Sequence, residues 1–329
     1  MSADDVVVGH AVALGGGHGL AATLGALRQV AENITAVVTV GDDGGSSGRI
    51  RREMPVLPPG DLRMALAALA GDRPEHQLAA RFLQHRFGGE GTLAGHNLGN
   101  LMITGLTEVL DGDTVAALDA VGQIAGAVGR VLPMSIIPLE LVANVSGLDP
   151  HHPSDTRRVR GQVAVATTRG HVESVEVVPT QPPACPDAVA AIDAADVIIL
   201  GPGSWFSSVI PHLLVPELVA AMQRSPARRY VSLNLEPQPG ETDGFTPCAL
   251  LRAFQQHAPN LRIDGVIADV RAAADSDLAA ECDRLGAALV IDDIASQLKP
   301  NAHDVPRYAK TLRMAFNTAR TQAGRPQNR

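Results

Sequence analysis

The sequence predicts an α/β fold, a mostly parallel sheet with helices on both faces and a β-rich insertion. Nearly all-apolar runs of strand length occur at 11–14, 34–40 and 196–200, as is typical of strands that are buried on both faces. Glycine-rich or polar loops follow these runs, and helical patterns lie between them. Between 131 and 180 this alternation gives way to several strand-like stretches in succession, which we interpret as the insertion.

Composition places the chain of 329 residues, 45% hydrophobic and 19% charged, among globular proteins. We predict a single α/β domain over 1–329, with the insertion at 131–180. A net charge of -8 and an aromatic content of 3% argue against a nucleic-acid partner. No run approaches the roughly 20 apolar residues of a membrane span, and the N-terminus lacks a signal-peptide pattern. Together with 3 scattered cysteines, these features predict a cytoplasmic protein.

The same patterns place the individual elements along the chain. Helical spacing predicts helices at 20–30, 61–87, 97–110, 186–194, 216–223 and 246–257, and a last one with Val305, Tyr308, Leu312 and Phe316 on its apolar stripe. Apolar runs predict strands at 6–8, 11–14, 34–40, 196–200 and 230–235, and around Val266 and Leu289. In the insertion, the predicted strands are 135–145, 162–167 and 172–178, with a polar connection at 151–160. The polar tail at 321–329 is expected to fray.

A glycine-rich loop, Gly15-Gly16-Gly17-His18-Gly19, follows the first strand and leads into a helix at Leu20. Glycine lets the chain turn sharply and brings backbone N–H groups close to an anion, and the helix N-terminus adds positive potential. A tight strand-to-helix turn is the alternative explanation. The loop lacks the third glycine of the dinucleotide fingerprint, which weakens an NAD-dependent oxidoreductase, and it lacks the Gly-Lys-Ser/Thr ending of a P-loop.

A second polar loop begins with two adjacent carboxylates, Asp42 and Asp43, and continues through small residues to Arg49. Carboxylates at the end of a buried strand suit a metal–phosphate or ribose site, although a solvated turn uses the same residue types. Asp61 follows a Pro-Pro-Gly turn, where it could join them or act only as a helix N-cap. If these carboxylates converge on one cation, we expect Asp43 and Asp61 to hold Mg²⁺.

Two further stretches carry polar groups that suit a ligand. Asn97 and Asn100 fall on one polar stripe of a predicted helix, where amides can bind a base or sugar and where Asn97 could instead cap the helix. The loop Gly201-Pro-Gly203-Ser204 leaves a buried strand, which is the place where open α/β sheets bind ligands.

Taken together and in order, these motifs resemble the YvcK-type gluconeogenesis factor family, within the superfamily of 2-phospho-L-lactate transferase (CofD-like proteins). The resemblance extends from about Val12 to Leu312. The motifs that carry it are Leu14-Gly-Gly-Gly-His-Gly-Leu20, Thr39-Val-Gly-Asp-Asp-Gly-Gly-Ser-Ser-Gly-Arg49, Pro58-Pro-Gly-Asp61, Gly95-His-Asn-Leu-Gly-Asn100, Ile199-Leu-Gly-Pro-Gly-Ser204 and Gly240-Glu-Thr-Asp-Gly244.

The resemblance implies a Rossmann-like sheet with a nucleotide in a crevice at the strand ends. YvcK-type members look like binders of UDP-N-acetylglucosamine that are needed for cell shape and wall synthesis on gluconeogenic carbon sources. The transferase branch joins a phospholactyl group to a deazaflavin precursor with loss of GMP, using Mg²⁺. Lys299 and Asn301 lie where relatives tend to carry an Arg-centred contact to the sugar nucleotide.

We therefore expect a cytosolic regulator that binds UDP-N-acetylglucosamine and acts through cell-wall regulatory proteins not yet identified; a Mg²⁺-dependent phospholactyl transferase, with Asp43 and Asp61 as its candidate catalytic residues, is the alternative. No cofactor is expected to be required, although Mg²⁺ can accompany the nucleotide, and homo-oligomerisation is an open alternative. The expected nucleotide-binding residues are Gly15, Gly16, Gly17, His18, Gly19, Leu20, Thr39, Asp42, Asp43, Ser46, Ser47, Arg49, Asn97, Asn100, Gly201, Gly203, Ser204, Ser207 and Asn234.

Overall fold

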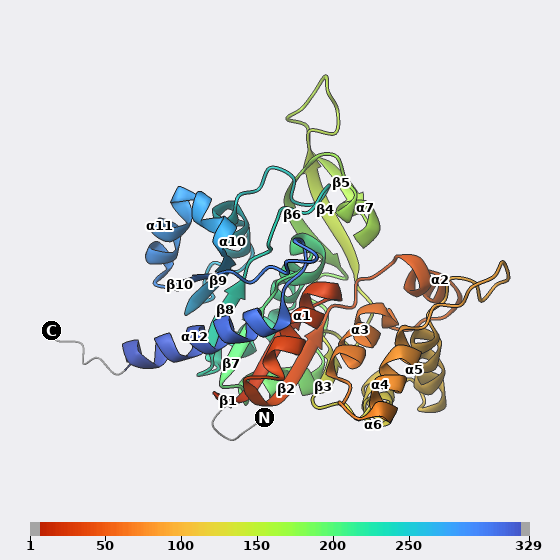
Figure 1. Cartoon of the computed structure of the whole chain (residues 1–329). Coiled ribbons are helices and arrows are strands. Elements are labelled where there is room, and N and C mark those ends of the chain that lie inside the picture. Colours follow the sequence, from red (N-terminus) through yellow and green to blue (C-terminus); the bar gives the residue numbers. More distant parts are fainter. Residues whose placement is uncertain (1–6, 324–329) are drawn as a thin grey trace.

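A parallel sheet forms the centre of the molecule in the computed structural model, which describes residues 7–323 (Figure 1). Within this range the sheet has 7 strands, and every neighbouring pair in it is parallel. The strands are β1 (Val8–Gly15), β2 (Ala31–Val38), β3 (Arg130–Pro133), β7 (Val197–Leu200), β8 (Arg228–Ser232), β9 (Gly265–Asp269) and β10 (Ala288–Asp292). Strands β1 and β7 are buried almost throughout, as their apolar sequences predict.

The order of the strands creates a switch point between β1 and β7. The sheet runs β10-β9-β8-β7-β1-β2-β3, so the chain builds outward from β1 through β2 to β3. It then returns to the other side of β1 and builds outward again through β7, β8, β9 and β10. The crevice outside the carboxyl ends of β1 and β7 is where such sheets bind ligands.

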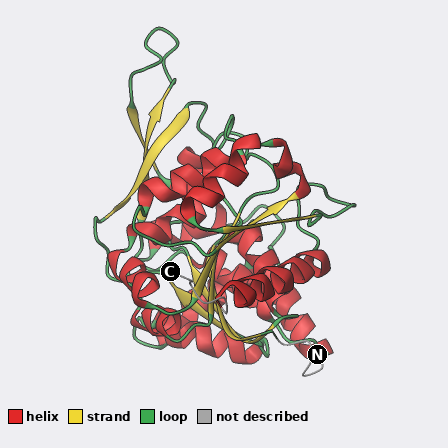
Figure 2. Cartoon of the chain, turned by 90° about the vertical axis from the view of Figure 1, so that its left-hand side faces the viewer, coloured by secondary structure: helices red, strands yellow, loops and turns green. Residues whose placement is uncertain are grey.

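Helices cover both faces of the sheet (Figure 2), which confirms the predicted fold class. On one face α1 packs against α3 and α12, and the connections after β7, β8 and β9 use α9, α10 and α11. The helices are α1 (Gly17–Leu27), α2 (Gly45–Glu53), α3 (Pro59–Leu69), α4 (Pro74–Gln84), α5 (Leu98–Val109), α6 (Thr114–Ile124), α7 (Gln162–Ala166), α8 (Pro186–Asp193), α9 (Pro216–Arg224), α10 (Pro247–His257), α11 (Ser276–Leu285) and α12 (Val305–Ala323).

The predicted β-rich insertion contains a small antiparallel sheet that extends away from the main body (Figure 1). Its order is β5-β4-β6, with β4 at Glu140–Ser146, β5 at Arg157–Arg160 and β6 at His171–Val178. Strand β5 lies in the stretch that we predicted as a polar connection. This strand pairs with β4, and its arginines Arg158 and Arg160 form ion pairs with Glu176 of β6 and Glu140 of β4.

The segment 162–167, predicted as a strand, instead contains the short helix α7. Gly161 turns the chain with a φ of 95°, which is the left-handed region that glycine tolerates. The Asp43 carboxylate then accepts a hydrogen bond of 3.0 Å from the backbone N–H of Val163. A distant carboxylate therefore stabilises the start of a helix that local sequence does not predict.

Several boundaries also differ from the sequence prediction. The long helix predicted at 61–87 is two helices, because residues 70–73 break it and Pro74 begins α4. Helix α2 begins at Gly45, inside the loop predicted at 41–48, and α6 and α11 were not predicted. Of the predicted tail, 321–323 belong to α12 and 324–329 lie outside the described residues. Residue 6 of the first predicted strand lies outside them as well.

A helix that crosses a membrane needs about 20 consecutive, mostly apolar residues. Among the described residues, no single helix has the length and apolar character for this. The helices Trp205–Leu214 and Pro216–Arg224 have sufficient length and apolar character only when taken together, and a bend of 74° separates them.

Candidate functional site

The two glycine-rich loops lie against each other at the switch point. Gly19 contacts the second loop so closely that a Cβ atom there would collide with the carbonyl oxygen of Pro202. The Thr23 hydroxyl of α1 donates a hydrogen bond of 3.1 Å to the carbonyl oxygen of Gly201. The sequence predicted both loops separately, and the fold brings them together at the end of the sheet.

A cavity of about 850 Å³ opens beside these loops. Its lining residues come from the start of α1, from the second glycine loop, from the segment after β8 and from the loop before α12. They include His18, Gly19, Gly203, Ser204, Asn234, Glu236, Gln238, Glu241, Lys299, Asn301 and His303. Five of these, His18, Gly19, Gly203, Ser204 and Asn234, are residues that the sequence predicted for the site.

Hydrogen bonds from the segment after β8 fix the second glycine loop. The Asn234 amide accepts from the N–H of Gly203 and donates to the carbonyl oxygen of the same residue, each at 2.8 Å. The Glu241 carboxylate accepts a 2.7 Å hydrogen bond from the N–H of Ser207, and burial raises the pKa of this carboxyl. Asn234 and Glu241 therefore position this wall of the cavity, and Ser207 is buried behind it.

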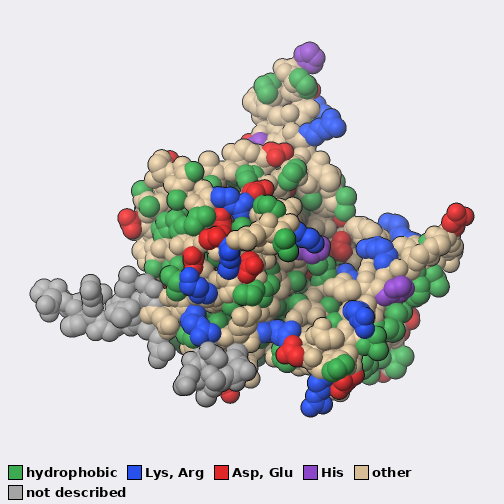
Figure 3. Space-filling model, in the orientation of Figure 1, with side chains coloured by type: hydrophobic (Ala, Val, Ile, Leu, Met, Phe, Trp, Pro, Cys, Tyr) green, Lys and Arg blue, Asp and Glu red, His purple; other side chains and the backbone are tan. Residues whose placement is uncertain are grey.

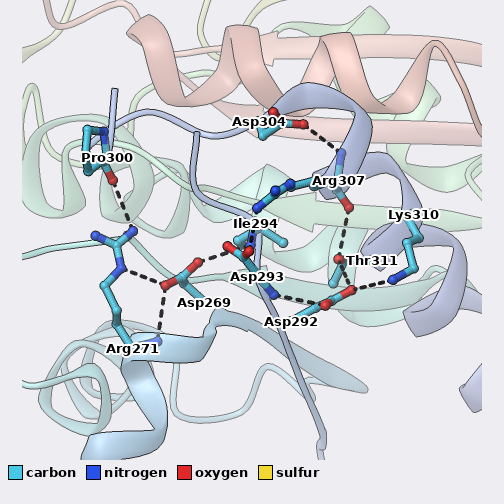
Figure 4. A network of polar contacts seen from close by, with 10 residues as sticks. All are labelled: Asp269, Arg271, Asp292, Asp293, Ile294, Pro300, Asp304, Arg307, Lys310 and Thr311. Carbon is cyan, nitrogen blue, oxygen red and sulfur yellow. Dashed lines mark hydrogen bonds and ion pairs between the residues drawn. The ribbon is translucent and has the colours of Figure 1, made fainter. Parts of the chain in front are cut away.

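The opposite wall is a loop that a polar network holds in place (Figure 4). Arg271 forms a 2.7 Å ion pair with Asp269 and donates a 3.1 Å hydrogen bond to the carbonyl oxygen of Pro300. The same Asp269 accepts a hydrogen bond from the N–H of Ile294, where this loop begins. The network thus fixes the segment that carries Lys299, the one lysine at the cavity.

His303 lies on the same loop, and burial lowers the pKa of its imidazole to about 4. Its Nε2 atom is buried and has no hydrogen-bond partner among the described residues. The imidazole is therefore neutral at pH 7 and can accept or donate one hydrogen bond to a ligand, depending on its tautomer.

A pair of carboxylates lies next to the first glycine loop. A Cβ atom on Gly16 would collide with the Asp61 carboxylate, and one on Gly60 would lie 2.6 Å from Asp42 Oδ2. Burial, followed by the charge of Asp42, raises the pKa of Asp61 to about 7. The methyl group of Thr39 also lies beside Gly16, and the buried hydroxyl of Thr39 has no partner among the described residues.

The Asp43 carboxylate, predicted to act with Asp61, has a different partner in the structure. Asp43 turns away toward α7, where its carboxylate accepts from the N–H of Val163. Its neighbour Asp42 faces Asp61 instead. The described residues contain no group of three or more His, Cys, Asp or Glu side chains that could hold a metal ion. Two carboxylates would suffice for Mg²⁺ only if a ligand supplied phosphate oxygens as well.

Other predicted site residues make contacts within the protein. Gly15 packs against the buried Leu20, and the Ser46 hydroxyl hydrogen-bonds to His96 at 3.0 Å. Arg49 donates to the carbonyl oxygens of Thr92 and Ala94, and so ties α2 to the loop before α5.

Three more of the predicted site residues lie outside the first cavity. Ser47 accepts a hydrogen bond of 3.0 Å from the N–H of Gly60. Asn97 precedes α5 without capping it by a side-chain hydrogen bond, and it lines a second cavity, described below. Asn100 is buried with an unpartnered side-chain oxygen.

Sequence reasoning did not select Gln238, Glu241 or His303 as site residues. Glu241 belongs to a motif that the sequence singled out, but nothing local showed that it faces Ser207. No local sequence pattern marked His303 as a site residue, because its position at the cavity depends on contacts that its loop makes with the end of β9.

The fold and the cavity together define a Rossmann-like α/β protein with a cleft at the switch point of a parallel sheet. A family model described as 2-phospho-L-lactate transferase CofD matches residues 11–309. The chain therefore belongs to the CofD family, and its similarity to the proteins below places it with the gluconeogenesis factors of that family.

Relatives and a solved structure support this placement. The chain is 59% identical over 258 residues to a Mycobacterium tuberculosis protein provisionally named gluconeogenesis factor, covering 78% of this chain and 75% of that protein. It is 37% identical over 243 residues to the gluconeogenesis factor of Bacillus subtilis, covering 74% and 73%. A Bacillus halodurans protein of the UPF0052 family has a similar crystal structure, with a TM-score of 0.81 and 31% identity over 92% of this chain and 98% of that one.

Proposed function

We propose that the protein is a cytoplasmic regulator that binds UDP-N-acetylglucosamine and influences cell shape, wall synthesis and growth on gluconeogenic carbon sources. One observation carries the proposal: two glycine-rich loops meet at the switch point of the sheet, beside a cavity of about 850 Å³. A volume of this order suits a nucleotide sugar. The names of the relatives support the metabolic part of the proposal.

The chemistry of the walls supports a ligand in which a diphosphate joins a nucleoside to a sugar. The N-terminus of α1 presents backbone N–H groups and the positive end of the helix dipole, and Lys299 lies on the facing wall. Asn301 and Gln238 offer amide groups that can bind the hydroxyl and carbonyl groups of a sugar or base. Asp42 and Asp61 could hold Mg²⁺ jointly with the phosphates.

Calorimetric titration with UDP-N-acetylglucosamine tests the binding. We expect binding by the wild-type protein and roughly tenfold weaker binding by Lys299→Ala, as is typical when one charged hydrogen bond to phosphate is lost. Lys310→Ala is the matched control, because Lys310 is the other lysine of the chain and pairs, from α12, with Asp292 at the end of β10. Absence of binding by the wild type, or equal losses in both variants, would contradict the assignment.

The regulatory part needs a genetic test. A strain that lacks the protein is expected to show a defect in shape or in resistance to wall antibiotics that depends on the carbon source. Complementation with the Lys299→Ala variant then shows whether nucleotide binding is required for the output. Normal shape and resistance on every carbon source would count against a regulatory role.

The adjacent carboxylates favour a second candidate, a Mg²⁺-dependent phospholactyl transferase. In that case Asp42 and Asp61, rather than Asp43, would carry the metal. Incubation with Mg²⁺, a lactyl diphosphoguanosine donor and the deazaflavin acceptor should release GMP if the protein is such an enzyme. We expect no GMP above background; release that disappears in Asp42→Asn would favour the transferase.

A further inference from the structure

A second cavity, of about 600 Å³, lies next to the first. It is bounded by α1, α3, α4 and the start of α5, and His18 lines both cavities. The proposed nucleotide site has no role for this space, since none of its other lining residues belongs to the first cavity.

The charged side chains that line this second cavity are all basic. Arg63 comes from α3, Arg81 from α4, and Arg86 from the segment after α4. No carboxylate lines the cavity, and within residues 7–323 none of the three arginines forms an ion pair. Basic side chains are visible on the part of the molecule formed by α2 to α6 (Figure 3). The lining of this cavity is therefore positively charged, and the carboxylates that act on Arg63, Asp61 and Asp42, lie outside the lining.

Arg63 is the unusual member of this group because it is buried, with 6% of its surface exposed. Its Nη1 donates to the side-chain oxygen of Gln84, while its buried Nε has no hydrogen-bond partner among the described residues. Burial, and then the charge of Arg86, lowers the pKa of Arg63; Asp61 and Asp42 act in the opposite direction. A buried guanidinium with an unused donor and a cationic neighbour is costly unless an anion is bound nearby.

We propose that this second cavity binds the phosphoryl group of a small phosphorylated metabolite. A guanidinium group binds two phosphate oxygens with paired N–H donors. Three guanidinium groups suit a ligand with a dianionic phosphoryl group better than a ligand with a single carboxylate. The volume exceeds that of a phosphate ion, so there is room for the rest of a metabolite. Met64, Ala67 and Ala80 give that part an apolar surface, and Asn97 offers an amide for a hydroxyl group.

The second cavity shares only His18 with the proposed nucleotide cleft, so the two sites are separate. Because the two cavities share only this residue, each can hold its own ligand at the same time. The inference stands on the arginines and not on the identity of the nucleotide, and its test therefore separates the two sites.

Calorimetry with the full chain tests the proposal, with glycerol 3-phosphate and inorganic phosphate as probes and glycerol as the uncharged control. We expect both anions to bind and glycerol not to bind. Arg81→Gln, at an exposed position that should not affect folding, and Arg63→Gln should each weaken glycerol 3-phosphate binding roughly tenfold or more. Arg73→Gln, an exposed arginine just before α4 and outside the cavity, is the matched control and should bind like the wild type.

Two results would overturn the inference. The first is no binding of either anion, or affinities that are the same in wild type, Arg81→Gln and Arg63→Gln. The second is displacement of glycerol 3-phosphate by saturating UDP-N-acetylglucosamine, which would show that the probe occupies the nucleotide cleft. Loss of UDP-N-acetylglucosamine binding in Lys299→Ala, with glycerol 3-phosphate binding retained, would support two separate sites.

Discussion

Replacing Asp61 with asparagine is expected to stabilise the protein at neutral and alkaline pH. Burial beside the first glycine loop, with the charge of Asp42 as a second cause, raises the pKa of Asp61 from 3.8 to about 7. The folded protein therefore holds a proton on Asp61 that the unfolded chain has lost above about pH 4. Between about pH 4 and pH 7 the native state binds more protons, so the free energy of unfolding falls as the pH rises.

The magnitude follows from the size of this pKa difference. At 1.36 kcal/mol for each pH unit, the ionised form of Asp61 destabilises the folded state by up to about 4 kcal/mol above pH 7. This value is an upper limit, because the side chain keeps some contact with solvent. Asparagine has nearly the same shape, can still accept the hydrogen bond from the Gly17 backbone, and carries no charge.

Urea denaturation of wild type and Asp61→Asn at pH 5, 6, 7 and 8 measures the effect. We expect the difference in the free energy of unfolding to favour the variant increasingly as the pH rises. Glu75→Gln, at an exposed position of α4, controls for removing a carboxylate elsewhere and should show no such trend. A difference between Asp61→Asn and wild type that is the same at pH 5 and pH 8 would refute the reasoning.

Three further outcomes can be measured on the purified protein. Gly19→Ala should destabilise the fold by about 2 kcal/mol or more in chemical denaturation, because its Cβ collides with backbone, while Gly88→Ala, which has open space around it, should not. Asn234→Ala should cost about 1–3 kcal/mol by removing both hydrogen bonds to Gly203, and should weaken UDP-N-acetylglucosamine binding in calorimetry. Trp205, the 1 tryptophan of the chain, is fully buried, so its fluorescence should shift to longer wavelength on unfolding; an unshifted emission would contradict that burial.

Local pattern alone was sufficient for both glycine loops and for the parallel sheet except its edge strand β3, which the sequence did not predict. Strands such as β1 and β7 are buried on both faces, and that burial requires the unbroken apolar runs that the sequence displays. Glycines at the ends of these strands follow from the sharp turns into the next segment, so they too are visible locally. The fold class and the ends of β1 and β7 were therefore predictable.

Where a segment's conformation depends on a distant partner, the sequence was insufficient. The valines of 162–167 suit a strand or a helix, and a carboxylate from the end of β2, Asp43, decides for the helix. The same contact turns Asp43 away from Asp61. Because adjacent side chains of an extended segment point to opposite sides, only the packing of the loop determines that Asp42 is the partner.

The walls of both cavities were decided by tertiary structure. One wall of the first cavity is the loop that carries Lys299. Arg271, which follows β9 and lies some thirty residues earlier in the chain, holds this loop in place. The second needs arginines from two helices to face one space, and each of them alone reads as an ordinary surface or helix residue. Sequence determines what a segment can bury, because apolar periodicity is local; it does not determine which polar groups meet, because that depends on how separate elements pack.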